Sequence, residues 1–428
     1  MSAGGAQGSG GMTGDGGSSG TGGSRGDGGA TASGGTASGG VTGRGGGNGG
    51  RGDGGAPGSG GTSSGGVTGR GGGSGGMAGA GGGTDGGLGA GGAGGAGDAG
   101  PCDIFAAAGM PCVAAHSVVR SLYKSYGGKL YQVRRSDSTT KDITALSPGG
   151  IADTSTEDAF CSGSCVVTVL YDQSTHGNDL WYQGSTQVPA APAAAPAKAG
   201  KETLKLGGHS VHSLYLDIGN CYWHDGSKSG MPTGKQPEGI YMVANGKHYN
   251  GGCCFDYGNS ETNRRADACG AMDAVYFGTD CWFSSQGAKC QGSGPWVMAD
   301  LECGMFTGGS TSVPNTQNIS MTSTYVTAML KNDGTNMALK GGNAQAGALT
   351  TLYSGKIASG WTMAKQGAID LGCGGDCCPP HGTGEYDSAG GVNASVGTFY
   401  EGAIVAGYPT DAVDDAVQSN IIAAGYGQ

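Results

Sequence analysis

Glycine in the first hundred residues most restricts what this chain can fold into. Of the 98 glycines in the 428-residue sequence, 51 fall in residues 1–100. The same segment contains no Phe, Trp, Tyr, Lys, Cys or His. Glycine loses more backbone entropy on ordering than other residues, and this segment has few apolar side chains whose burial could offset that loss. We therefore predict a disordered Gly-rich tether over 1–100 and a folded domain over 101–428.

The predicted tether contains a tandem repeat. Residues 25–50 and 51–76 are two copies of one 26-residue unit, differing at four positions. A fixed period can indicate a solenoid, but each copy has one sizeable apolar residue, Val41 or Val67, so no stacked core can form. Each copy opens with Arg-Gly-Asp, which leaves a surface adhesion role as one alternative for the protein.

Charge and hydropathy exclude several kinds of partner. The chain has a net charge of −10, and only 13% of its residues are charged. The folded part has no basic cluster of the kind that binds nucleic acid or anionic lipid. Its uncharged apolar stretches are far shorter than the roughly 20 residues of a membrane helix. We expect a monomer without cofactor, metal, nucleic-acid partner or membrane span.

The 14 cysteines all lie in the folded part and indicate an oxidising compartment. The opening residues, Met1 to Gly5, lack the basic and apolar regions of a secretory signal. We therefore expect a protein that is secreted or tethered at the cell surface, with its export signal removed or encoded upstream of Met1.

The folded part is predicted to be mostly strand. Runs rich in β-branched and aromatic residues predict strands at 166–171, 239–243, 272–277, 296–306, 324–330, 336–339, 349–353, 368–371 and 396–405. Apolar stripes predict short helices over 112–123 and 411–424, and a Pro-rich run predicts a loop over 188–196. The expected fold is an all-β, antiparallel β-sandwich of jelly-roll or concanavalin-like type with short peripheral helices.

Two places in the sequence could supply a pair of catalytic carboxyl groups, as glycoside hydrolysis commonly requires. Within 296–306, Asp300 and Glu302 have the same parity, which would put both on one face of a strand. Asp376 follows a glycine pair ending at Gly375, where a ligand could approach closely. The alternatives are an incidental acidic pair on a solvated face and an ordinary turn aspartate.

Adjacent cysteines occur at residues 253–254 and 377–378. A vicinal disulfide would present a flat, polarisable sulfur surface, whereas the alternative pairs each cysteine with a distant partner. A zinc site made from the second pair with Cys373 and His381 is disfavoured, because their spacing is not that of regular CxxC pairs.

Eight motifs occur in this chain in a characteristic order: Pro101-Cys102-Asp-Ile-Phe, Pro111-Cys112-Val-Ala-Ala-His116-Ser, Gly149-Gly-Ile-Ala-Asp153, Cys253-Cys-Phe-Asp-Tyr-Gly-Asn259, Gly294-Pro-Trp296, Asp300-Leu-Glu302, Gly374-Gly-Asp376 and Gly397-Thr-Phe-Tyr-Glu-Gly402. With them the chain resembles, over residues 101–428, the α-L-arabinofuranosidase B catalytic domains of glycoside hydrolase family 54.

The resemblance implies an exo-acting enzyme that removes terminal non-reducing α-L-arabinofuranosyl units from arabinan and arabinoxylan with retention of configuration. It implies Glu302 as nucleophile and Asp376 as general acid/base. The implied sugar-binding residues are Asp300, Trp282, Gly375 and the vicinal disulfide of Cys253 and Cys254. The implied short-range disulfides are Cys102 with Cys112 and Cys161 with Cys165.

One departure from the resemblance falls beside the implied nucleophile. Fungal members have two asparagines there, whereas this chain has Cys303-Gly304, so sugar contacts would be lost or supplied elsewhere. Retention requires the carboxyl groups of Glu302 and Asp376 to lie about 5–5.5 Å apart. The alternative function is a noncatalytic carbohydrate-binding sandwich on the cell surface.

Overall fold

A computed structural model describes residues 99–189, 194–264, 269–281, 290–310, 313–359, 361–372 and 394–428. The chain divides into two units, residues 1–85 and 86–428, and all described residues belong to the second. The predicted disorder of the tether concerns residues that lie outside this description, apart from residues 99 and 100.

Strands make up most of the regular structure. They are β1 (Cys112–Ser117), β2 (Lys129–Arg135), β3 (Thr140–Thr144), β4 (Cys165–Leu170), β5 (Leu180–Tyr182), β6 (Thr203–Leu206), β7 (His209–His212), β8 (Leu214–Leu216), β9 (Tyr222–Asp225), β10 (Glu238–Tyr249), β11 (Asp256–Ser260), β12 (Asp273–Gly278), β13 (Trp296–Asp300), β14 (Met305–Phe306), β15 (Tyr325–Asn332), β16 (Asn336–Asn343), β17 (Ala346–Lys356), β18 (Ala368–Leu371) and β19 (Gly397–Val405). The helices within the described ranges are α1 (Pro101–Ala107), α2 (Thr154–Cys161) and α3 (Asp411–Ala423). No helix in these ranges has both the length and the apolar character needed to cross a membrane.

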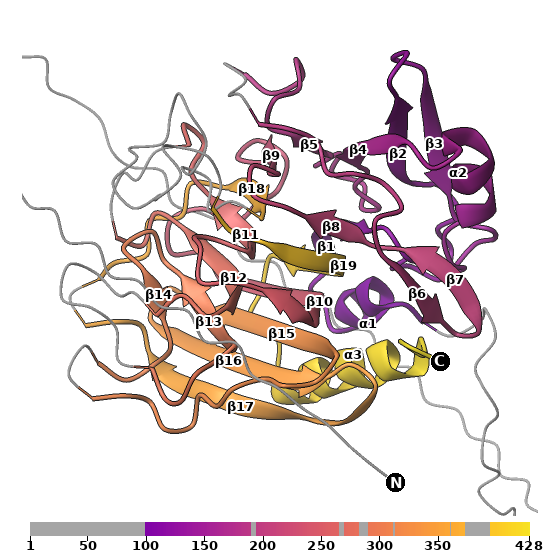
Figure 1. The fold of residues 1–428 in the computed structure, drawn as a ribbon. Coiled ribbons are helices and arrows are strands. Elements are labelled where there is room, and N and C mark those ends of the chain that lie inside the picture. The colour runs from indigo at the N-terminus through magenta and orange to yellow at the C-terminus, as the bar shows by residue number, and fades with distance from the viewer. Residues whose placement is uncertain are drawn as a thin grey trace, which may run out of the picture. The chain divides into compact units, whose positions relative to one another are not determined.

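The strands form two large antiparallel sheets and one small one (Figure 1). The seven-stranded sheet has the order β1-β19-β10-β15-β16-β17, with β8 also paired to β19. The ten-stranded sheet has the order β14-β13-β12-β11-β18-β9-β5-β4-β2-β3, and β6 pairs with β7. The two large sheets pack together: the rings of Tyr257 in β11 and Phe399 in β19 lie 5.3 Å apart. The predicted all-β antiparallel sandwich is confirmed.

The predicted helix over 112–123 is wrong. Residues 112–117 form β1, which pairs antiparallel with β19 so that Ser117 lies opposite Glu401. The Val118 amide then donates to the carbonyl of Tyr400 at 3.0 Å. Hydrogen bonds to a distant strand therefore override a short apolar stripe whose valines suit a strand equally well.

Most other sequence predictions match the structure. The strand predicted over 296–306 is instead two strands, β13 and β14, joined by a reversal. The other eight predicted strands each correspond to one observed strand, and the C-terminal helix is α3. The described ends of the segment 188–196 contain no helix or strand, as the loop prediction requires.

Alternation along the strands separates the sandwich core from the outer face of the ten-stranded sheet. Tyr257, Val275 and Ala299 are paired across β11, β12 and β13, and all three belong to the main hydrophobic core. The next residues along β11 and β13 are Gly258 and Asp300, which alternation directs to the opposite face. Asp300 thus lies on the sheet face turned away from the sandwich core.

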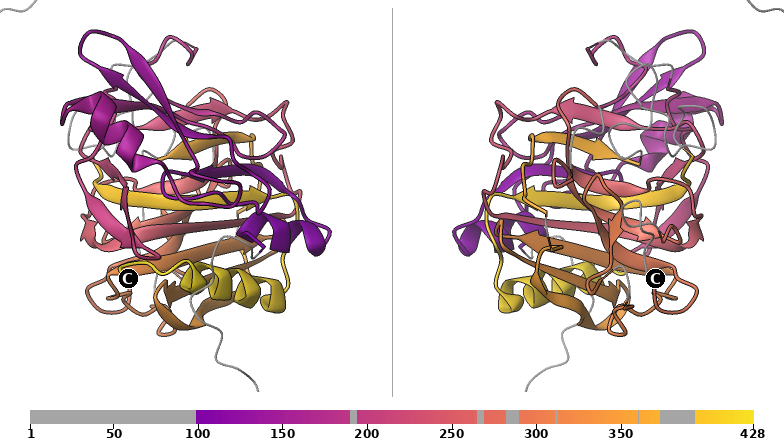
Figure 2. Two further views of the ribbon diagram at one scale, coloured as in Figure 1. Left: turned by 90° about the vertical axis from the view of Figure 1, so that its right-hand side faces the viewer. Right: turned by 90° about the vertical axis from the view of Figure 1, so that its left-hand side faces the viewer.

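Helix α3 packs on the seven-stranded sheet, near β15, β16 and β17 (Figure 2). Lys331 and Lys340 place their Nζ atoms 2.7 and 2.8 Å from Asp414 Oδ2 in the helix. Both lysines also contact Asp411 Oδ1, at 2.8 and 2.7 Å. These ion pairs fix the first turn of the helix to the sheet.

Candidate active site

Asp300 and Glu302 lie at the reversal between β13 and β14. Asp300 is the last residue of β13 and pairs with Met305, the first residue of β14. The amide of Leu301 donates to the Gly304 carbonyl at 3.4 Å, and Glu302 has a φ of +73°. A left-handed backbone at a non-glycine residue costs about 1–2 kcal/mol, so surrounding contacts must hold it in place.

The two carboxylates are therefore not alternate residues of one continuous strand, and that part of the parity prediction is wrong. Gly304, with a φ of +119°, lets the chain reverse, and pairing of Ala299 with Phe306 continues the sheet. The two acidic residues still lie together, because the Glu302 amide donates to Asp300 Oδ1 at 3.1 Å. Asp300 is buried and Glu302 is partly exposed.

A row of directly paired residues crosses the outer face of the ten-stranded sheet from Asp300. Asp300 lies opposite Ala274 in β12, Ala274 opposite Gly258 in β11, and Gly258 opposite Asp370 in β18. Directly paired residues share one face of a sheet, so both aspartates face the same side. Only the small residues alanine and glycine stand between them, across about 14 Å of sheet.

The vicinal cysteines lie at the Asp300 end of this row. Cys253 and Cys254 are joined by a disulfide and by a cis peptide bond in the connection between β10 and β11. Their two Sγ atoms and a carboxylate oxygen of Asp300 all lie within 4.8 Å of one another. Sulfurs in a disulfide are not the thiolates that bind metals, so this group presents a sulfur surface beside a carboxylate.

A small apolar cluster supports the disulfide. Cys254 packs with Tyr276, Trp296, Met298 and Met305, all of them buried residues of β12, β13 and β14. The sulfur surface is thus held on the same strands that carry Asp300.

Two further polar residues of the site were not identified in the sequence analysis, Asp256 and Tyr276. They face each other across β11 and β12, and both are fully buried. Burial raises the pKa of Tyr276 well above its ordinary value, and the carboxylates of Asp280, Asp300 and Asp256 raise it further. The sequence signal that could have identified Asp256 is parity: Asp256 precedes Gly258 by two residues in β11 and therefore faces the same side of the sheet.

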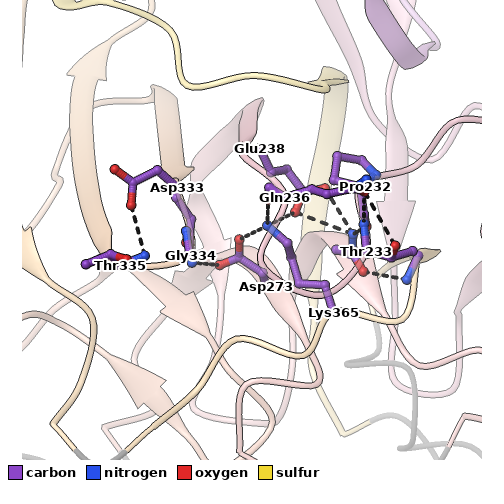
Figure 3. A network of polar contacts seen from close by, with 12 residues as sticks. Pro232, Thr233, Gln236, Glu238, Asp273, Asp333, Gly334, Thr335 and Lys365 are labelled. Carbon is purple, nitrogen blue, oxygen red and sulfur yellow. Dashed lines mark hydrogen bonds and ion pairs between the residues drawn. The ribbon is translucent and has the colours of Figure 1, made fainter. Parts of the chain in front are cut away.

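A buried ionic cluster lies at the start of β12 (Figure 3). Its residue Asp273 directly precedes Ala274, which pairs with Asp300. The Nζ of Lys365 lies 3.3 Å from Glu238 Oε2 and 3.6 Å from Asp273 Oδ2. It also donates to the carbonyl of Gln236 at 2.8 Å. Two carboxylates and one lysine are thus brought together with almost no exposure to water.

Amide side chains complete this cluster. Asn259 donates to Glu238 Oε1 at 3.1 Å, and Asn332 donates to Asp273 Oδ1 at 3.4 Å. Burial raises the pKa of Glu238 to about 7, with Lys365 opposing the shift and Asp273 adding to it. One proton is therefore retained at Glu238 up to near neutral pH.

The structure contains five disulfides between described residues, and Cys221 is also disulfide-bonded. Three are the pairs that the resemblance implied: Cys102 with Cys112, Cys161 with Cys165, and Cys253 with Cys254. The other two are Cys269 with Cys303 and Cys281 with Cys290, whose pairing could not be predicted from the sequence.

Several candidate residues lie outside the described ranges: Trp282, Gly375, Asp376, and the disfavoured zinc ligands Cys373, Cys377, Cys378 and His381. The separation of Glu302 and Asp376 thus stays a prediction. The structure brings together Asp300, Glu302, Cys253 and Cys254.

Comparison with known proteins gives a consistent result. Residues 101–427 match the family described as "Alpha-L-arabinofuranosidase B, catalytic". The chain is 46% identical over 343 residues to Alpha-L-arabinofuranosidase B of Emericella nidulans, and 43% identical over 341 residues to the probable enzyme of Aspergillus fumigatus. Both alignments cover 77% of this chain and 62% of the relative, so the chain spans about three fifths of these relatives' length.

Solved structures agree with this assignment. A family 54 α-L-arabinofuranosidase soaked with a cyclic sulfate inhibitor is 39% identical, with a TM-score of 0.68, over 76% of this chain and 66% of that one. An arabinofuranosidase complexed with arabinofuranosyl-α-1,2-xylobiose is 38% identical, with a TM-score of 0.67, over 77% and 66% of the two chains. This chain therefore belongs to the α-L-arabinofuranosidase B catalytic domain family, glycoside hydrolase family 54.

Proposed function

We propose that this protein is a retaining, exo-acting glycoside hydrolase that removes terminal non-reducing α-L-arabinofuranosyl residues from arabinan- or arabinoxylan-type polysaccharides. The supporting observation is the meeting of Asp300 with the Cys253–Cys254 disulfide beside Glu302, in a chain that belongs to this family. The related arabinofuranosidase complexed with arabinofuranosyl-α-1,2-xylobiose supports the same substrate class.

In this proposal the reaction runs through two displacements. A Glu302 carboxylate oxygen attacks the anomeric carbon while Asp376 donates its proton to the departing glycosidic oxygen. The bond to the leaving group breaks, and an arabinosyl ester of Glu302 forms. Asp376 then takes a proton from water, the water oxygen attacks the same carbon, and the ester bond breaks to release arabinose with retained configuration.

Asp300 and the disulfide bind the sugar in this proposal. The Asp300 carboxylate accepts hydrogen bonds from furanose hydroxyls, and its buried position strengthens each of them. The paired sulfurs contact the furanose ring in this proposal, and Trp282 and Gly375 are the further sugar-binding residues that the family resemblance implies. The hydrogen bond from the Glu302 backbone amide to Asp300 Oδ1 links the sugar-binding carboxylate to the nucleophile.

The expected substrate is a neutral polymer, and the expected location is outside the cell. The five disulfides between described residues support an oxidising compartment, and we propose a protein that is secreted or tethered at the cell surface. We further propose that it acts as a monomer without a cofactor.

Hydrolysis of 4-nitrophenyl α-L-arabinofuranoside by the full chain tests this function directly. We expect turnover by wild type, and a loss on the order of 10³-fold or more in kcat for Glu302→Gln and for Asp376→Asn. Glu157→Gln is the matched control, because it makes the same change in a carboxylate that is not part of the proposed site. Glu157 lies in α2 and accepts a hydrogen bond from Tyr131. NMR of the first-formed anomer checks retention. Sugar binding without turnover would instead support the noncatalytic carbohydrate-binding alternative.

A further inference from the structure

The two neighbours of Glu302 are both held by one short segment. The Gly270 amide donates to the carbonyl of Leu301 at 2.8 Å, on one side of Glu302. Cys269 forms a disulfide with Cys303, on the other side. Residues 269 and 270 are consecutive, and they bind the turn at residues 301 and 303. The disulfide joins positions 34 residues apart in the sequence.

The segment formed by residues 269 and 270 is itself held in place by further contacts. Gly270 has a φ of +86°, and a Cβ there would lie 2.5 Å from the carbonyl oxygen of Thr362. The Gly270 carbonyl accepts a hydrogen bond from the Ala364 amide at 2.8 Å. Only glycine fits this close approach, so residue 270 is tied to the 362–364 segment at one defined distance.

The buried ionic cluster of Figure 3 lies next to this contact. Lys365 directly follows Ala364, and Asp273 lies three residues after Gly270. The Lys365–Asp273 ion pair therefore joins the same two segments that the Gly270–Ala364 hydrogen bond joins. The turn at Glu302 is thus connected to the rest of the domain by three interactions in series: the Cys269–Cys303 disulfide, the Gly270–Ala364 hydrogen bond and the Lys365–Asp273 ion pair.

We propose that the Cys269–Cys303 disulfide and the Gly270–Leu301 hydrogen bond are positioning elements for the nucleophile, a clamp that holds Glu302 in its left-handed conformation. The inference rests on the function proposed for Glu302. In this role both cysteines act through the backbone on either side of Glu302. The clamp is tied to this chain's own Cys303, where the sequence departs from the fungal pattern.

The physical reason is the precision that covalent catalysis requires. A nucleophile must stay within about 0.5 Å of its productive position, and a 1 Å displacement can cost on the order of 100-fold in rate. A left-handed glutamate relaxes toward the ordinary backbone regions when its neighbours are free to move. Fixing residues 301 and 303 restricts that freedom through the backbone.

The test compares wild type with the double variant Cys269→Ser/Cys303→Ser in the full chain. We expect kcat for 4-nitrophenyl α-L-arabinofuranoside to fall roughly 10- to 100-fold while KM changes less than about 3-fold. Amide hydrogen exchange in the peptide spanning 297–306 should become faster. The split between kcat and KM distinguishes loss of positioning from a general loss of folded protein, which would leave KM and the kcat of the folded fraction unchanged.

The control is Cys102→Ser/Cys112→Ser, which removes a disulfide between α1 and β1. It should lower thermal stability and leave kcat unchanged. If the Cys269→Ser/Cys303→Ser chain does not accumulate folded, Gly270→Ala carries the test, because the added Cβ displaces the amide that binds Leu301.

Three outcomes would overturn these conclusions in different ways. An unchanged kcat in a folded clamp variant overturns the positioning role. A kcat loss of equal size in the control does so too, because the loss would then follow overall stability. An inactive wild type overturns the proposed function instead, and the clamp is then judged by exchange alone, where unchanged rates at 301–304 refute it.

Discussion

Replacing Glu238 by glutamine should make this protein more stable at pH 8 and leave its stability unchanged near pH 4. Glu238 is fully buried in the cluster with Lys365 and Asp273. Glutamine has the shape and polarity of a protonated glutamate, and its Oε1 can still accept the hydrogen bond from Asn259. The substitution therefore keeps the hydrogen bond from Asn259 and removes the ionisation of the carboxyl.

The size of the effect follows from the pKa. Burial raises the pKa of Glu238 from 4.5 to about 7 in the folded protein, and each unit corresponds to about 1.36 kcal/mol. Below pH 4.5 the group is protonated in the folded and the unfolded chain. As pH rises to 7 the unfolded chain releases the proton first, so wild-type stability falls. The stability difference between variant and wild type should therefore grow from near zero to about 3 kcal/mol.

Urea unfolding followed by tryptophan fluorescence, with disulfides intact, measures this difference at pH 4, 6 and 8. Titration of groups elsewhere is common to both proteins and cancels in the comparison. A difference that does not change with pH would refute the reasoning. A variant less stable than wild type at pH 8 would also refute it, since the Glu238–Lys365 ion pair would then outweigh the cost of burying the charge.

Two further predictions concern the surface and the tether. Asp411→Asn should lower stability by less than about 1 kcal/mol at pH 7, since that side chain is 77% exposed. Hydrogen bonds from Lys331 and Lys340 lower the pKa of Asp411 from 3.8 to about 2, so its stabilisation is present above pH 3.8 and is lost as pH falls through 2. Thermal melts should show a larger difference between variant and wild type at pH 7 than at pH 2, and an equal difference at both would contradict this. Deleting residues 1–98 should leave kcat and melting temperature unchanged, because that segment lacks aromatic residues and cysteines; a tenfold loss of kcat would contradict it.

Local pattern was sufficient to predict most of the strands and the sandwich, because alternation and β-branched residues reflect burial against the opposite sheet. It failed at 112–117, where pairing with β19 decides the structure. It also failed at Glu302, because the apolar alternation continues through Leu301 while the backbone reverses.

The candidate site could be predicted only as far as its residues are recognisable in sequence. Asp300, Glu302 and the vicinal cysteines were identified, but Asp256 and Tyr276 were not, because their place in the site depends on which strands are neighbours. The pairing of Cys269 with Cys303 was beyond prediction for the same reason. Contacts between segments far apart in sequence depend on the register of the sheets, which no local pattern specifies.

The pairing of β1 with β19 has a consequence for biosynthesis. Ser117 lies opposite Glu401, so about 280 residues must follow the first strand before its partner exists. At about 5–20 residues per second, the ribosome needs roughly 15 to 55 seconds to supply them. During that time β1 lacks its partner strand, and the edge of β10 that receives β19 is also open. The seven-stranded sheet can therefore be completed only after β19 has been synthesised, and until then the edges of β1 and β10 that it joins have no partner.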